Sequence, residues 1–212
     1  MRIRFEEQLA QLNGSLIEMA EIVKKAIADA NKALIDQDVE LAQRIIDSDD
    51  EIDDKEEEIE SMCLKLLLQQ QPVAGDLRLV SAIMKIITAL ERIGDHATDI
   101  SELTLLLADE QYIKKLEHIP QMAVIVIQMV KDGVQAYINR DIELARSLDR
   151  TDDKVDRLFN VVMSDLTALI KKDPDNAEQA IMFMMITKYL ERIGDHAVNI
   201  GEWVEYAIMG RR

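Results

Sequence analysis

An eight-residue segment occurs twice in this chain, and this internal repetition is the feature that most limits the possible folds. The segment Leu-Glu-Arg-Ile-Gly-Asp-His-Ala fills positions 90–97 and returns at 190–197, one hundred residues later. Shorter matching segments lie upstream in the same order, within 38–53 and 141–156 at an offset of 103 residues. Matching blocks in matching order indicate a tandem duplication, in which two similar units stack into one structure.

The composition indicates that each unit is helical. The 212 residues include only seven glycines and three prolines, whereas average usage would place these turn formers at about 12% of a chain. A sandwich, a barrel or a doubly wound α/β protein needs a turn every few residues, so this chain is unsuited to those folds. Gly-x-Gly-x-x-Gly, P-loop and Gly-x-Ser-x-Gly motifs are also absent from the sequence. The sequence predicts an all-α fold.

Each copy divides into three expected helices. The breaks follow from the segments Asp36-Gln37-Asp38 and Asn139-Arg140-Asp141, which supply cap residues, and from Pro72 and Pro174, which end helices. The expected helices span 3–35, 38–70 and 76–108 in the first copy, and 121–138, 141–172 and 176–208 in the second.

The fold class expected from this pattern is a tandem duplication of two long up-down-up three-helix bundles, with six helices in total. Residues 1–108 would form the first repeat, 121–212 the second, and 109–120 the connection.

The charge balance restricts the partners. There are 41 acidic and 25 basic residues, for a formal net charge of −16, so we expect no nucleic-acid partner, because phosphate neutralisation needs a basic face. The single Cys63 excludes an internal disulfide and fits a reducing compartment. The N-terminus does not resemble a signal peptide, and no apolar run approaches the roughly 20 residues of a membrane span. We expect a cytoplasmic protein without a membrane span.

Two acidic side chains lie beside the apolar stripe of each second helix. With 100° of rotation per residue, Asp49 and Asp53 lie about 40° and 80° around the helix from Ile45, the first residue of the stripe. Asp152 and Asp156 take the same angles in the second copy. The stripe itself consists of Ile45, Ile52, Ile59 and Leu66 in the first copy, and of Leu148, Val155 and Val162 in the second.

The third helices repeat a row of polar side chains at one edge of their apolar faces. Successive members are four residues apart, so like charges repel one another along the row in both copies. The row consists of Glu91, Asp95 and Asp99 in the first copy, and of Glu191, Asp195 and Asn199 in the second.

These acids allow two interpretations. They can be solvated helix faces, as most charge runs are. Alternatively, a bound cation offsets their repulsion, and the repetition of the set beside the core in both copies favours this second interpretation. Ligand sets made only of oxygen suit Mg²⁺, Ca²⁺, Mn²⁺ or iron.

Three other candidate positions are not expected to be metal ligands. Glu56 lies near the stripe, but Phe159 takes its place in the second copy. His96 and His196 point about 100° away from the preceding aspartates, and the Glu-x-x-His spacing of di-iron bundles is absent. We expect both histidines at the surface or between helices.

The sequence resembles the PhoU family, the phosphate-transport regulatory proteins of bacteria. The resemblance rests on Gln-Gln-Pro-Val-Ala-Gly-Asp-Leu-Arg at 70–78 and on Leu-Glu-Arg-Ile-Gly-Asp at 90–95 and 190–195. It implies two three-helix bundles without enzymatic activity, bearing iron or zinc clusters on acidic motifs. The implied ligands are Asp49, Asp53, Glu91, Asp95, Asp99, Asp152, Asp156, Glu191, Asp195 and Asn199.

The same resemblance implies partners and a role. Family members act with the ATPase-driven phosphate transporter and a phosphate sensor histidine kinase to repress phosphate-starvation genes. Long helical faces also favour a homodimer. The alternatives are a carboxylate-bridged metalloenzyme and a metal-free helical adaptor. Because the first copy has Asp99 where the second has Asn199, we hypothesise that the first site holds cations more tightly.

Overall fold

The computed structural model describes residues 2–70 and 73–210, and these residues are almost entirely helical. Within them there are seven α-helices and one short 3₁₀ helix, and no strand. The elements are α1 (Arg2–Asp36), α2 (Val39–Asp47), α3 (Asp50–Gln70), α4 (Ala74–Leu107), α5 (His118–Asn139), α6 (Ile142–Lys172), η1 (Pro174–Asn176) and α7 (Ala177–Met209).

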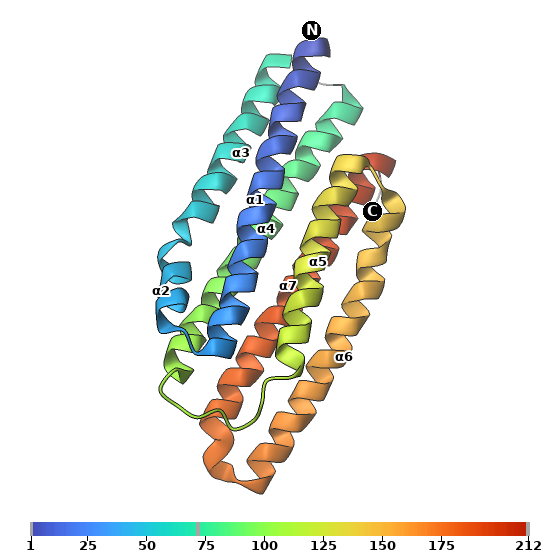
Figure 1. The fold of residues 1–212 in the computed structure, drawn as a ribbon. Coiled ribbons are helices and arrows are strands. Elements are labelled where there is room, and N and C mark those ends of the chain that lie inside the picture. The colour runs from blue at the N-terminus through green and yellow to red at the C-terminus, as the bar shows by residue number, and fades with distance from the viewer. Residues whose placement is uncertain (1, 71–72, 211–212) are drawn as a thin grey trace.

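The helices form two three-helix bundles that lie side by side (Figure 1). The first contains α1, α2 with α3, and α4, and the second contains α5, α6 and α7. Helices α4 and α7 run in opposite directions and pack extensively against each other between the bundles, and α1 also contacts α5. The expected all-α fold, with two up-down-up bundles from a tandem duplication, is confirmed.

The turn between the first two helices is the same in both copies. Asp38 accepts a hydrogen bond from the Leu41 amide (2.9 Å), and Asp141 accepts one from the Leu144 amide (3.0 Å). One residue before each cap, Gln37 and Arg140 adopt left-handed backbone geometry at φ 53° and 54°. Both predicted caps are therefore confirmed.

Proline has the expected position in the second copy. Helix α6 ends at Lys172, and Pro174 begins the short 3₁₀ helix that leads into α7. Pro72, the expected counterpart, lies outside the described residues. Helix α5 begins at His118, inside the stretch 109–120 that was expected to connect the copies.

The second helix of the first copy differs from expectation, because it breaks between α2 and α3. The Ser48 hydroxyl donates to the Ile45 carbonyl at 3.1 Å and turns the backbone away from regular helix. Asp49 then accepts a hydrogen bond from the Thr98 hydroxyl on α4 at 2.8 Å. In the second copy, Val198 stands in place of Thr98, and α6 continues unbroken.

One hydrophobic core extends through both bundles. Every residue of the two predicted stripes is buried, from Ile45 (6% exposed) to Val155 (0%). This burial fixes which faces of α3 and α6 meet α4 and α7, and it leaves the acidic positions at the edges of those contacts. Among the described residues, no helix combines the length and apolarity needed to cross a bilayer.

Candidate metal centres

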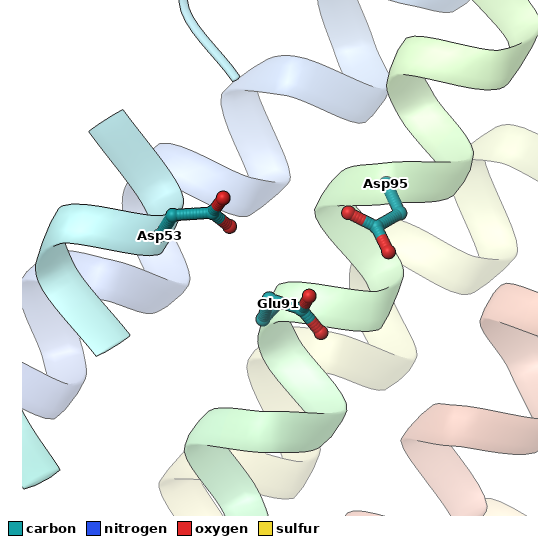
Figure 2. A group of neighbouring side chains, drawn as sticks. All are labelled: Asp53, Glu91 and Asp95. Atoms are coloured by element: carbon teal, nitrogen blue, oxygen red, sulfur yellow. The ribbon is translucent and has the colours of Figure 1, made fainter. Parts of the chain in front are cut away.

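Three carboxylates of the first copy converge between α3 and α4. Asp53 lies on α3 and faces Glu91 and Asp95, one helical turn apart on α4 (Figure 2). One oxygen of each side chain lies within 4.8 Å of the other two. Gly94 allows the close approach, because a Cβ atom there would lie only 2.6 Å from Ile52 Cδ1 on α3.

The three acids of this cluster all have raised pKa values, because they are partly buried and repel one another. Burial, reinforced by Asp95, Glu56 and Asp53, raises the pKa of Glu91 to about 7, against the opposing effect of Arg92. The pKa values of Asp53 and Asp95 are also raised, chiefly by burial. The buried Oε2 of Glu91 has no hydrogen-bond donor, and its charged neighbour Arg92 Nε lies 3.3 Å away. Arg92 Nη1 also lies 3.0 Å from Asp95 Oδ2, so a single arginine pairs with two of the three carboxylates.

Asp49 and Asp99 lie outside this group of three. Asp49 accepts its hydrogen bond from Thr98, and His96 Nδ1 lies 3.0 Å from an Asp99 oxygen. Together with Asp95 they line a cleft of about 570 Å³ that also reaches residues of α7. Asp49 is nevertheless near enough to raise the pKa values of both Asp53 and Asp95.

The two histidines pack between the copies, as expected for an inter-helix role. His96 is 8% exposed, and its ring stacks on His196 (centroids 5.6 Å apart) and on Tyr189 (5.4 Å). They are not part of the carboxylate cluster.

In the second copy, Asp152 is the most perturbed acid. Burial raises its pKa to about 7, and Asp156, Asp195 and Glu191 add to the shift. Its Oδ1 atom is buried without a hydrogen-bond partner. The carboxylate lies directly on Gly194, where an added Cβ would collide with Oδ1. This aspartate is thus held against the core by the same glycine position that brings α3 and α4 together.

The remaining acids of the second copy are less tightly grouped. Glu191 Oε2 accepts a hydrogen bond from Lys188 Nζ at 2.5 Å. Among the described residues, only the first copy brings three possible metal ligands within 4.8 Å. Asn199 is exposed on α7 and occupies the position of Asp99. The structure therefore gathers Asp53, Glu91 and Asp95, and leaves the other predicted ligands beside them or in looser groups.

Two residues beside the carboxylate clusters were not among the predicted ligands or their partners. Glu56 accepts a hydrogen bond from Thr88 at 2.9 Å and helps to raise the pKa of Glu91. Its small angle from the apolar stripe was the available signal. Lys188 was overlooked, although its spacing three residues before Glu191 predicts contact on a helix.

The residues present fit a hard cation. Carboxylate oxygens are the ligands preferred by Mg²⁺, Ca²⁺ and Mn²⁺, and they also bind iron and zinc. The buried Oδ1 of Asp152 has no hydrogen-bond partner, and such atoms are costly without a compensating partner. The buried Oε2 of Glu91 accepts no hydrogen bond and has only the ion pair with Arg92 at 3.3 Å. A cation would supply that partner and would offset the repulsion that raises the pKa values.

The fold and site define a class of protein: a duplicated helical bundle with acidic clusters where the second and third helices of each copy meet. The PhoU domain model matches residues 16–104 and again residues 119–204. The chain belongs to the PhoU family.

Relatives of similar length support this assignment. A Clostridium acetobutylicum protein described as a phosphate-specific transport system accessory protein PhoU homolog is 38% identical, over 98% of this chain and 95% of its own length. A protein of Aquifex aeolicus with the same description is 39% identical, over 88% of this chain and 84% of its own length. The crystal structure of PhoU from Pseudomonas aeruginosa has a TM-score of 0.92, with 33% identity over 97% of this chain and 99% of that one.

Proposed function

We propose that this protein is a cytoplasmic, non-enzymatic, metal-binding negative regulator of phosphate uptake and phosphate-starvation signalling. It acts through the phosphate ABC transporter ATPase and a phosphate sensor histidine kinase. Membership of the PhoU family along the whole chain carries the phosphate role. The converging carboxylates around Glu91 support the metal-binding part.

The proposed metal has a structural task. It would join α3 to α4 through Asp53, Glu91 and Asp95, and in the second copy it would join α6 to α7 through Asp152, Asp156, Glu191 and Asp195. Iron or zinc clusters follow from the family resemblance, and Mn²⁺, Mg²⁺ or Ca²⁺ fit the same oxygen ligands. No residue stands out as a nucleophile beside these clusters, which is why we favour regulation over catalysis.

Elemental analysis of the full chain, purified without chelator, tests the metal-binding part. We expect bound metal in the wild type and none in the double variant Asp95→Ala/Asp195→Ala. Asp29→Ala, which removes a carboxylate on α1 that pairs with Lys25, is the matched control. Metal-free wild-type protein would instead support a helical adaptor, and metal accompanied by turnover would support an enzyme.

A deletion strain tests the regulatory part independently of the metal. Phosphate-starvation genes should switch on in rich phosphate when the gene is removed, because the repressor is then missing. Complementation with the wild-type chain should switch them off again. Unchanged repression in the deletion strain would refute the regulatory role even if metal is bound.

We further propose that the protein is a homodimer. Leu64, Leu68 and Leu77 lie around the α3–α4 end of the first bundle and are 47%, 85% and 48% exposed. Leu64 and Leu68 are one turn apart on α3, and exposed large apolar side chains on a helix face can serve a protein contact. Light scattering after gel filtration should give twice the 24.2 kDa chain mass, and Leu68→Lys should lower it.

A further inference from the structure

The two copies differ at one pair of facing positions beside the carboxylates. In the first copy, the Thr88 hydroxyl on α4 donates to Glu56 on α3 at 2.9 Å. At the equivalent positions of the second copy, Lys188 Nζ on α7 lies 5.6 Å from the ring centroid of Phe159 on α6. A carboxylate and a hydroxyl in one copy are thus replaced by an aromatic ring and an ammonium group in the other.

The ammonium group is directed at a candidate metal ligand. Lys188 Nζ lies 2.5 Å from Glu191 Oε2, and the Glu191 side chain is only 16% exposed. The ring of Phe159 covers the ammonium from the other helix, a favourable arrangement for a cation over an aromatic face.

In the first copy, Thr88 takes the place of this lysine, and the cation beside Glu91 is Arg92, whose Nε lies 3.3 Å from Glu91 Oε2. The second copy has an arginine at that position as well, Arg192, so Lys188 is the additional cation.

The charge of the second helix around each cluster also differs between the copies. Residues 47–58 of the first copy include nine acidic side chains and one lysine, whereas the matching residues 150–161 include three acidic and three basic side chains. Charges within about one Debye length, roughly 8 Å in physiological salt, act on a bound ion. The second helix of the first copy therefore carries more net negative charge around its cluster than the second helix of the second copy.

We propose that Lys188 is a built-in counter-cation of the second cluster, and that its ammonium competes with a metal ion for Glu191. A divalent cation then fills the first copy at low concentration and fills the second only when it displaces Lys188. This inference rests on the proposed metal-binding function. It makes occupancy of the second copy a graded response to metal concentrations at which the first copy is already filled.

Calorimetric titration of the chelator-treated full chain with Mn²⁺ tests the proposal. The wild type should bind in two steps, because the lysine pair and the less acidic surroundings both weaken the second copy. Background variants assign the steps, since Glu91→Gln should remove the tighter step and Glu191→Gln the weaker one. An ion pair with an exposed ammonium changes an equilibrium constant by about fivefold at most. We therefore expect Lys188→Thr to raise the Mn²⁺ affinity of the weaker step by up to that factor.

Swapping residues between the copies sharpens the test. Phe159→Glu/Lys188→Thr installs the residues of the first copy and should bring the weaker step closest to the tighter one. Thr88→Lys in the first copy should weaken the tighter step. Lys188→Arg keeps the cation and should leave the weaker step as in the wild type. Lys131→Thr removes an exposed lysine on α5 and controls for net charge.

Thermal unfolding in chelator gives a second readout that needs no metal. Lys188→Thr should lower the Tm, because the acids of the second cluster lose their counter-charge, and added Mn²⁺ should restore it. Two equal Mn²⁺ steps in the wild type, or a weaker step unchanged by Lys188→Thr, would overturn the inference while leaving the metal-binding proposal intact. Absence of Mn²⁺ binding from the wild type and every variant would overturn both.

Discussion

The side chain of Glu91 sits at a protonation midpoint near neutral pH. Its pKa rises from the ordinary 4.5 to about 7 because the carboxyl is buried beside Asp95, Glu56 and Asp53. Asp152 reaches a similar pKa in the second copy, again chiefly through burial. One acid in each copy therefore retains its proton in the folded state well above the pH at which an unfolded chain releases it.

This difference predicts how the metal-free protein responds to pH. Between pH 4.5 and about 7 the folded state holds a proton on Glu91 that the unfolded state has lost, so stability falls as pH rises through that window. The full shift would correspond to about 3.4 kcal/mol, and solvent screening of the partly solvated carboxyl reduces the loss from this residue to on the order of 2 kcal/mol above pH 7. Urea unfolding in chelator should show Glu91→Gln to be more stable than the wild type at pH 8, with little difference at pH 4.5. Equal pH profiles for the two proteins would contradict the assigned cause.

The same protons should oppose metal binding. A cation that binds Glu91 or Asp152 must displace the proton, so affinity should rise with pH. We expect Mn²⁺ to bind about tenfold more tightly at pH 8 than at pH 6, as measured by calorimetry in buffers with different ionisation heats. Proton release upon binding at pH 6.5 is the accompanying signature, and its absence would argue against these two acids as ligands.

At the scale of the helices, glycine positions determine how closely the acidic edges approach. Gly94 and Gly194 occupy the same place in the two copies, and each lies under a side chain of the facing helix, Ile52 in one case and Asp152 in the other. The glycines are needed here for a close approach between helices. The first cluster forms because α3 and α4 come together at Gly94.

Substitution of Gly94 tests this contact. Gly94→Ala would place a Cβ atom 2.6 Å from Ile52 Cδ1. Such overpacking typically lowers the free energy of unfolding by about 1 to 3 kcal/mol. The matched control is Gly14→Ala on α1, where nothing lies within 4 Å of the added Cβ, and where alanine should stabilise the helix by about 0.5 to 1 kcal/mol. Urea denaturation should thus give shifts of opposite sign. A stabilising Gly94→Ala would show that α3 and α4 have room to separate.

At the scale of the whole molecule, the two copies share a single core rather than meeting as separate domains. Core residues of both bundles belong to one cluster, and the stacked rings of His96, His196 and Tyr189 lie where α4 meets α7. The copies should therefore unfold together.

Differential scanning calorimetry of the metal-free chain tests this coupling. We expect one transition, with a calorimetric enthalpy equal to the van't Hoff enthalpy, because breaking either bundle exposes the core of the other. His96→Ala removes two ring contacts and a buried side chain, and it should lower the Tm by several degrees without splitting the transition. Two resolved transitions in the wild type would mean that each repeat is an independent domain.

Much of the fold was predictable because its signals are local or repeated. The apolar stripes through Ile52 and Val155 and the caps at Asp38 and Asp141 depend on residues within a few turns of one another. The duplication is visible because whole segments repeat about one hundred residues apart. The break at Ser48 and Asp49 was not predictable in this way. It coincides with a hydrogen bond from Thr98, and that residue is 49 positions away from Asp49.

The candidate site was likewise predictable only in part. Helical angles placed Asp53, Glu91 and Asp95 at the edges of buried faces, and the structure brings these three together. The same angles gave equal weight to Asp49 and Asp99, whose partners Thr98 and His96 draw them away. Periodicity assigns a side chain to a face of its own helix, but it does not specify which residues of the neighbouring helix it meets.

The sequence by itself determined that this protein is an all-helical tandem duplication with repeated carboxylates beside its core, because period, capping and repetition are properties of the chain. Only the tertiary structure decided which carboxylates converge and that the Phe159 ring of α6 lies beside Lys188 of α7. The physical reason is that the distance between groups on different helices depends on how the helices pack. That packing is set by small residues such as Gly94 and by large ones such as Ile52, acting across the interface.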